Sequence, residues 1–347
     1  MSACAHLSAS LGRHSHKYLS SKARLQAIRR AQVWESTDVA GKNVKVGPQE
    51  SGAFAQNETV RCTYRDKKLK GHSPKFDCAI TPEDEVKVKY GRENGEVYAE
   101  VAATRLFWAL GFPADRMYPV RVACLGCPSD PSVNKNDRRD QVIFDPAAIE
   151  RKLKGTTLEE REGSGWIWPE LDLVDESDGG APRAQRDGLK LLAVLIQHTD
   201  TKAQQQRLMC LKHKADDAGD VCAEPVLMVN DLGMTFGSAN LFNRSVPGSV
   251  NFEHWSKEPI WADAKRCIGN LSVSQTGSLE NPVISEAGRK FLADLLVQLS
   301  DRQLHDLFEV ARFPERHSEH IRAATTEEWV NVFKRKRSEI AGLTCPS

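Results

Sequence analysis

The sequence predicts an α+β fold with two lobes, in which short strands come first and long helices follow. Between residues 43 and 90, short runs rich in Val, Thr and Tyr alternate with turn residues, a pattern typical of β-strands. Beyond residue 181, apolar residues recur at helical spacing. A chain of 347 residues is long enough for two hydrophobic cores. We therefore predict a disordered or helical extension at residues 1–40, a β-rich first lobe at 41–139 and a helical second lobe at 140–347.

The strands predicted for the first lobe lie at residues 43–46, 59–64, 76–80, 85–90 and 117–124. The segment 85–90 alternates most regularly, with Val86 and Val88 interleaved with Lys87 and Lys89. Because successive side chains of a strand point to opposite faces, the two lysines would share one face. Such a face either meets solvent or binds a ligand that attracts cations.

The helices are predicted at residues 22–34, 96–110, 182–197 and 285–299, with two more after residues 300 and 325. Gly111 is a typical C-terminal stop for the helix before it. Ser300 and Thr325 each begin a capping box. The basic helix at 22–34 is expected to lie across the first lobe as a strap, and the charged segment 212–224 to form a hairpin tip or surface loop.

Charge and hydropathy exclude some classes of partner. The net charge is +1, and basic and acidic residues are interleaved, which argues against binding nucleic acid through phosphate neutralisation. No apolar run approaches the ~20 residues that a bilayer span requires. The N-terminus lacks the hydrophobic core of a signal peptide, so we expect a cytoplasmic protein. A start codon placed too far downstream would hide a leader, and the protein would then be exported.

The nine cysteines leave two possibilities open. Cys124 and Cys127 form a CxxC, but no second pair completes a zinc pattern, so we expect no metal at the cysteines. In a reducing compartment most would be buried thiols. In an exported protein, Cys124–Cys127 or Cys210–Cys222 could be disulfides, and the acidic residues could bind Ca²⁺ without any phosphoryl transfer.

The stretch from Leu189 to Gln205 joins an apolar helix to a polar loop that carries His198, Asp200 and Lys202. It resembles the catalytic loop of protein kinases, His-Arg-Asp-Leu-Lys-Pro-Glu-Asn, with His, Asp and Lys in register. The resemblance implies that His198, Asp200 and Lys202 are catalytic residues. Asp200 would accept the proton of the substrate hydroxyl, and Lys202 would neutralise charge on the transferred phosphoryl group. Gln205 stands where that loop has a metal-binding Asn.

A second apolar segment, at residues 226–229, leads to Asp231-Leu-Gly233. This resembles the Asp-Phe-Gly motif, whose Asp holds Mg²⁺ between phosphates, and it implies that Asp231 is a metal ligand together with Gln205. A simpler alternative stays open, in which His198 and Asp200 merely end a helix and Asp231 begins a turn.

The first lobe carries matching residues. Lys89 stands where Val-Ala-Ile-Lys places the phosphate-contacting lysine, and Glu100 is the expected ion-pair partner, with Glu96 in reserve. Lys87 departs from the pattern, because a small residue usually faces the adenine there. No Gly-x-Gly-x-x-Gly loop is present.

The segment before the lysine strand offers Gly71, Ser73 and Lys75, which resemble the phosphate loop of HipA-type kinases. The chain thus resembles, over roughly residues 69–237, the atypical HipA-like branch of the kinase fold, as an uncharacterised bacterial-type family. The resemblance implies transfer of phosphate from ATP, with Mg²⁺ or Mn²⁺, to a hydroxyl. A protein acceptor is preferred because HipA-like kinases phosphorylate proteins. The alternative is a catalytically silent kinase-like binding or scaffold module.

Overall fold

The computed structural model describes residues 15–67, 69, 71, 73–216, 219–237, 250–272, 277–316 and 321–346, with side chains omitted at 214–221. Residues 1–14, most of the segment predicted to be disordered, lie outside these ranges, as do Lys70 and His72 of the predicted phosphate loop.

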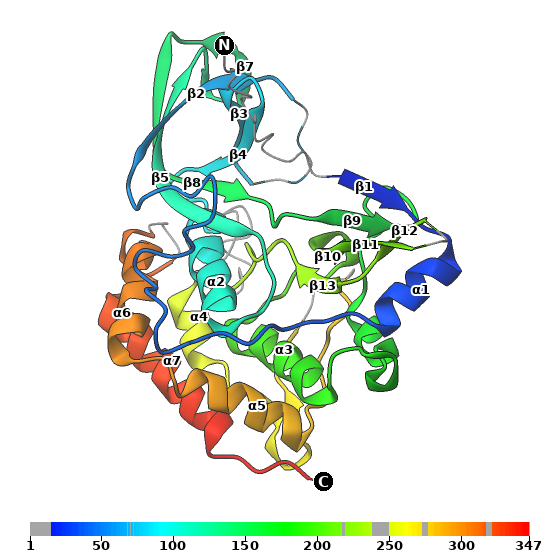
Figure 1. Cartoon of the computed structure of the whole chain (residues 1–347). Coiled ribbons are helices and arrows are strands. Elements are labelled where there is room, and N and C mark those ends of the chain that lie inside the picture. The colour runs from blue at the N-terminus through cyan, green and yellow to red at the C-terminus, as the bar shows by residue number, and fades with distance from the viewer. Residues whose placement is uncertain are drawn as a thin grey trace, which may run out of the picture.

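A closed barrel forms the β-rich part of the molecule, at the top of Figure 1. Around the barrel the strands are β2 (Thr59–Arg65), β3 (Lys75–Thr81), β4 (Asp84–Tyr90), β8 (Gln141–Arg151) and β5 (Arg116–Leu125). Aromatic and β-branched side chains fill its interior, among them Phe76, Val88 and Phe144. The barrel therefore has a core of its own, as expected for a separate lobe.

The barrel extends beyond the boundary predicted at residue 139. Strand β8 begins at Gln141 and pairs with both β4 and β5. The polar, Pro-containing segment that suggested a border is instead a small hairpin of β6 (Pro128–Asp130) and β7 (Asn134–Arg138). The strand predicted at 43–46 is absent from the described chain, because these residues form turns.

The helical part lies below the barrel in Figure 1 and shares one large core. Its helices are α2 (Glu96–Leu110), α3 (Arg183–Ile196), α4 (Phe252–Lys257), α5 (Glu286–Leu296), α6 (Asp301–Val310) and α7 (Thr326–Ala341). Helix α2 ends at Gly111 as predicted, and the predicted capping boxes at Ser300 and Thr325 both form. Each capping box satisfies two backbone donors that the helix itself leaves unpaired.

The basic N-terminal helix α1 (Ser21–Arg29) packs on the helical part and not on the first lobe. Arg24 binds Glu170 through both guanidinium Nη atoms, at 2.5 and 2.9 Å, and Arg29 binds Asp175 at 2.5 Å. These carboxylates lie in or just beyond the short helix η1 (Trp168–Leu173). The expectation of a strap on the first lobe is therefore wrong, because the acidic partners lie elsewhere.

A four-stranded sheet lies between the barrel and helix α3 (Figure 1). Its order is β1 (Ser15–Tyr18), β9 (Thr156–Glu159), β10 (Gln206–Cys210) and β13 (Pro225–Val229). The segment 212–224 forms a hairpin of β11 (His213–Asp216) and β12 (Gly219–Cys222), one of the two forms predicted for it. Strands β14 (Trp261–Asp263) and β15 (Ile268–Gly269) form a separate small pair.

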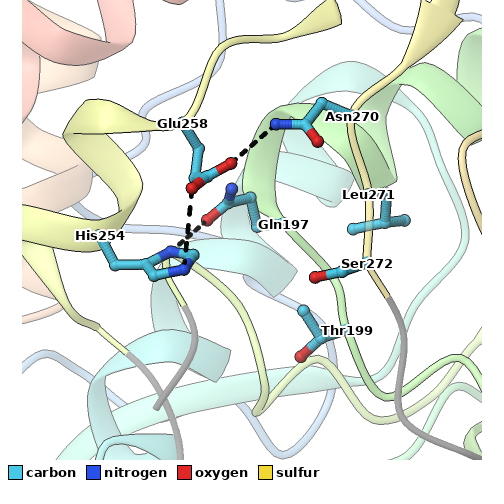
Figure 2. A pocket seen from close by; sticks show the side chains of 7 residues that line it. All are labelled: Gln197, Thr199, His254, Glu258, Asn270, Leu271 and Ser272. Carbon is cyan, nitrogen blue, oxygen red and sulfur yellow. Dashed lines mark hydrogen bonds and ion pairs between the residues drawn. The ribbon is translucent and has the colours of Figure 1, made fainter. Parts of the chain in front are cut away.

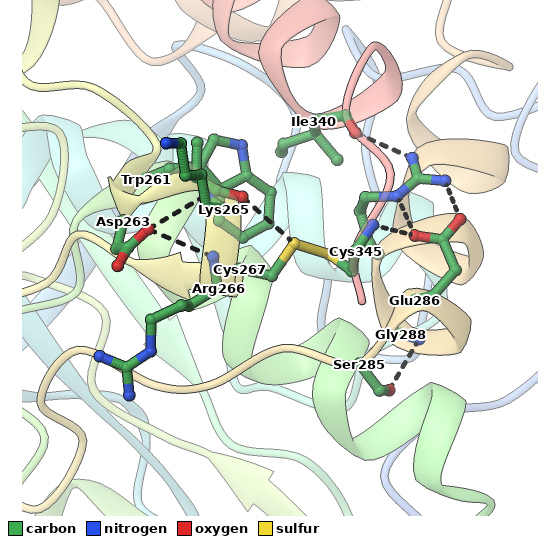
Figure 3. The surroundings of a disulfide bond; sticks show 12 residues. Trp261, Asp263, Lys265, Arg266, Cys267, Ser285, Glu286, Gly288, Ile340 and Cys345 are labelled. Carbon is green, nitrogen blue, oxygen red and sulfur yellow. Dashed lines mark hydrogen bonds and ion pairs between the residues drawn. A yellow bond between two sulfur atoms is a disulfide. The ribbon is translucent and has the colours of Figure 1, made fainter. Parts of the chain in front are cut away.

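Every cysteine in the described part of the chain is paired: Cys62–Cys78, Cys124–Cys127, Cys210–Cys222 and Cys267–Cys345. Figure 3 shows the last pair, which joins the C-terminal segment to the turn between β14 and β15. There the Cys345 N–H donates to Glu286 at 2.8 Å, and Glu286 in turn binds Arg289.

Such pairing persists in oxidising compartments and is rare in the cytosol. Two of the four pairs, Cys124–Cys127 and Cys210–Cys222, are the disulfides considered above for an exported protein. None of the helices that the structure describes is long and apolar enough to cross a membrane.

Candidate functional site

The pairing of β10 with β13 brings the two predicted loops together. Gln206 at the start of β10 lies opposite Val229 at the end of β13. The loop before β10 and the loop after β13 therefore meet at one end of the sheet. Their connection is direct, because the main-chain oxygen of Gln205 accepts hydrogen bonds from the N–H groups of Asn230 at 2.9 Å and Asp231 at 3.4 Å.

Asp200, Lys202 and Gln205 form one cluster on the first of these loops. The Oδ2 atom of Asp200 lies 2.8 Å from Lys202 Nζ and accepts a hydrogen bond from Gln205 Nε2 at 2.7 Å. The carboxylate stays partly accessible, at 20% exposure of its side chain. Thr201 connects the loop to the rest of the helical part, because its Oγ1 accepts a hydrogen bond from the N–H of Ser278 at 3.0 Å. An accessible, fixed carboxylate is suited to accept a proton.

His198 belongs to the same loop but has a different environment. It is completely buried, and its ring lies 6.3 Å from that of Trp168. Neither ring nitrogen has a hydrogen-bond partner among the described residues. Burial lowers the pKa of His198 to about 4, so the ring is neutral at physiological pH. His198 therefore positions the loop and has no access to a substrate, in contrast to the catalytic role predicted for it.

Lys89 connects the barrel to helix α2. Its Nζ lies 2.6 Å from a carboxylate oxygen of Glu96 and 2.6 Å from one of Glu100, one helical turn apart on α2. Asp231 lies 4.0 Å from the same Nζ. Lys89 thus contacts both glutamates between which the sequence left a choice. Gly233 allows this approach, since a Cβ there would lie 2.7 Å from Glu96 Cγ.

The electrostatics of this cluster are those of a buried cation surrounded by anions. Desolvation acts to lower the pKa of Lys89, but the charges of Asp231, Glu100 and Glu96 outweigh it and hold the pKa well above its usual range. Burial raises the pKa of Glu100, and the neighbouring carboxylates add to this against the opposing charge of Lys89. Burial also acts to raise the pKa of Asp231, but Lys89 outweighs it and keeps that pKa below its usual range.

Lys87 lies on the same strand face as Lys89 and has its own partner. Its Nζ contacts Glu150 at 2.6 Å, and the two residues are paired across β4 and β8. Burial acts to raise the pKa of Glu150, but Lys87 outweighs this and lowers it to about 2. Glu150 was missed from the sequence, because only the strand register places it beside Lys87. Lys87 and Lys89 are therefore both paired, to different carboxylates.

Gly71, Ser73 and Lys75, the predicted phosphate-binding residues, lie close together beside Lys89. Lys75 is the direct neighbour of Lys89 across β3 and β4, so the two side chains share a face. Desolvation lowers the pKa of Lys75, and the charge of Lys89 adds to this. Ser73 is buried, with its Oγ 3.5 Å from Lys75 Nζ. Gly71 has a φ of +90°, and a Cβ there would lie 2.8 Å from the same Nζ.

The residues present fit a phosphate ligand with a divalent cation. Glu100 Oε2 is buried and accepts no hydrogen bond from any described residue. Asp231 stays a carboxylate, because its pKa lies below the usual range, and at 31% exposure of its side chain it is accessible to a cation. Lys75 and Lys89 are neighbouring ammonium groups, which an anion such as a phosphate stabilises. Asp231 and the Oε1 atom of Gln205 are oxygen donors of the kind that Mg²⁺ prefers.

The fold and the site together define a mixed α/β protein with a lysine–carboxylate cluster between a barrel and a helical part. No family model matches the chain, and no curated protein matches it. Among solved structures, the crystal structure of a Helicobacter pylori proinflammatory kinase, CtkA, is similar to the chain, with 9% identity and a TM-score of 0.42. The match covers 83% of this chain and 95% of that one.

Proposed function

We propose that the protein is a kinase-like phosphotransferase that uses ATP with Mg²⁺ or Mn²⁺ to phosphorylate a hydroxyl on a protein. The observation that carries the proposal is the buried Lys89, which lies 2.6 Å from both Glu96 and Glu100 and 4.0 Å from Asp231. The loop that presents Asp200 is hydrogen-bonded to the Asp231 loop through Gln205. The likeness to the HipA-like branch, carried by Gly71, Ser73 and Lys75, is part of the proposal.

Each residue then has a role in phosphoryl transfer. Lys75 and Lys89 bind phosphate oxygens, and Gly71 and Ser73 close over them. Asp231 and Gln205 hold the divalent cation, which when bound neutralises charge on the phosphates.

Asp200 accepts the proton of the acceptor hydroxyl, and its contacts with Lys202 and Gln205 fix its orientation. Lys202 also stabilises charge that develops on the transferred group.

A thermal-shift titration with ATP, with and without Mg²⁺ or Mn²⁺, tests the nucleotide site. A ligand that binds only the folded state stabilises it by about 2.7 kcal/mol at a concentration of 100 Kd. We expect a metal-dependent shift in the wild type that Asp231→Ala abolishes. Asp294→Ala is the matched control, because that carboxylate is exposed and forms a surface ion pair with Lys290, away from the proposed site. No shift at millimolar ATP in the wild type would refute the proposal.

Transfer is tested separately from binding. Asp200→Asn keeps the size of the side chain and removes the proton acceptor, so it should retain the nucleotide shift and lose transfer of labelled phosphate. A wild-type protein that binds MgATP but transfers no phosphate, to itself or to peptides, would instead support the silent module.

A further inference from the structure

A small polar pocket lies beside the proposed catalytic loop (Figure 2). Its volume is about 130 Å³. The side chains that line it include Gln197 and Thr199, at the end of helix α3, and His254, Glu258, Asn270 and Ser272.

The pocket is lined by Thr199, which lies on one loop of the proposed active site and is hydrogen-bonded to the other. Thr199 directly precedes Asp200, and its N–H donates to the main-chain oxygen of Met234 at 3.1 Å, just beyond Asp231-Leu-Gly233. A group held in the pocket would therefore lie next to the place where the acceptor hydroxyl meets Asp200.

The chemistry of the pocket favours a cation. Among the lining residues that the structure describes, Glu258 is the one with an acidic side chain. One carboxylate oxygen accepts from Asn270 Nδ2 at 2.8 Å, and the other lies 3.9 Å from His254 Nε2. Asn270 Nδ2 also donates to the Pro259 main-chain oxygen at 3.2 Å, which leaves Oδ1 as the polar atom of that amide with acceptor capacity. Lys336 contacts the main-chain oxygen of Glu258 and is not a lining residue.

We infer that this pocket binds the ammonium or guanidinium end of a Lys or Arg side chain that lies close in sequence to the phosphorylated hydroxyl of a protein acceptor. The inference rests on the proposed function and names its substrate class. Size decides in favour of a side chain, because pockets for whole small ligands measure about 300–1,000 Å³ and this one is about 130 Å³. A carboxylate with nearby acceptor oxygens binds either cationic group through charge-assisted hydrogen bonds.

The test is phosphorylation of a positional peptide library with a fixed central Ser or Thr, using labelled MgATP. Wild type should select Lys or Arg at one position. Glu258→Gln keeps the shape of the side chain and removes its charge, and it should reduce kcat/KM for the selected basic peptide by roughly tenfold. Glu253→Gln is the matched control, because Glu253 lies on helix α4, which ends just before Glu258, and it is exposed and does not line the pocket. Ser272→Lys, which places a competing cation at the exposed rim, should also abolish the preference.

The nucleotide-dependent thermal shift, measured on every variant, separates this inference from the proposed function. If the wild type shows no shift with MgATP, the proposed function fails, and the acceptor site fails with it. If MgATP binds but peptides are phosphorylated without a basic preference, the pocket assignment is wrong. The same holds if no peptide is phosphorylated, or if Glu258→Gln and Glu253→Gln behave alike.

Discussion

Replacement of His198 by Phe tests whether this residue is structural. The ring is completely buried, and burial lowers its pKa to about 4, whereas its usual value is 6.5. The unfolded chain therefore binds a proton as the pH falls below 6.5, while the folded protein does not until about pH 4. Folding stability from this residue is full at neutral pH and is lost progressively between these two values.

The size of the effect follows from the same two pKa values. Their difference corresponds to about 3 kcal/mol in total, of which about 2 kcal/mol is lost by pH 5. His198→Phe removes the titrating group. Between pH 7.5 and pH 5, the free energy of unfolding of the variant should therefore fall by about 2 kcal/mol less than that of the wild type. Other titrating groups contribute equally to the pH dependence of the free energy of unfolding in both proteins, so their contribution cancels when the two proteins are compared.

Urea unfolding followed by tryptophan fluorescence, at several pH values across this range, measures the effect. Trp168 lies near His198 and reports on the same region. If both proteins lose the same stability on acidification, His198 is not a buried neutral residue and the argument fails. A native-state NMR titration of the ring with a midpoint near 6.5 would refute it directly.

Two further predictions concern the stability of the fold. Lys89→Met should destabilise the protein by roughly 3–5 kcal/mol, because it leaves buried carboxylates without their cation. The double variant Lys89→Met/Glu100→Gln should recover part of that loss. If Lys89→Met and the wild type unfold at the same urea concentration, Lys89 does not stabilise the buried carboxylates. Cys267→Ser/Cys345→Ser opens a link across 78 residues of sequence. In the chain-entropy description, the double variant should lose about 4 kcal/mol of its free energy of unfolding, measured by urea unfolding without reductant. An unfolding midpoint equal to that of the wild type would argue against this disulfide.

The features of the site that the sequence predicted are local ones. The alternation around Lys87 and Lys89 follows from the two-residue period of a strand, and Glu100 follows from helical spacing after it. The meeting of the Asp200 and Asp231 loops depended on a resemblance to kinases, because no short-range pattern encodes the pairing of β10 with β13.

Two of the differences between prediction and structure involve partners far away in the chain. Residues 43–46 look like a strand, but the main-chain oxygens of Val44 and Lys45 bind the guanidinium of the buried Arg105 and not a neighbouring strand. Glu150 is paired with Lys87 only through the register of β8. Both partners are separated from their sites by more than one element, which hydrophobic periodicity does not report.

The cysteines show the same limit. Cys62 lies opposite Cys124 across β2 and β5, and Cys78 Sγ is 3.7 Å from Cys124 Sγ. Alternative pairings within this group are therefore close in space. The sequence suggested Cys124–Cys127 and, elsewhere, Cys210–Cys222, both of which close short loops, but it did not suggest Cys62–Cys78 or Cys267–Cys345.

Gln205 stands where the kinase loop has Asn, and it contacts both loops of the proposed site. Its main-chain oxygen binds the N–H groups of Asn230 and Asp231, and its side-chain Nε2 binds Asp200. The main-chain contacts do not depend on the side chain, so the extra methylene of Gln affects only the reach of the amide. That amide reaches Asp200 at 2.7 Å, so Gln at this position still connects to the proposed proton acceptor. These contacts hold the two loops together, which both the proposed phosphotransferase and the silent module require.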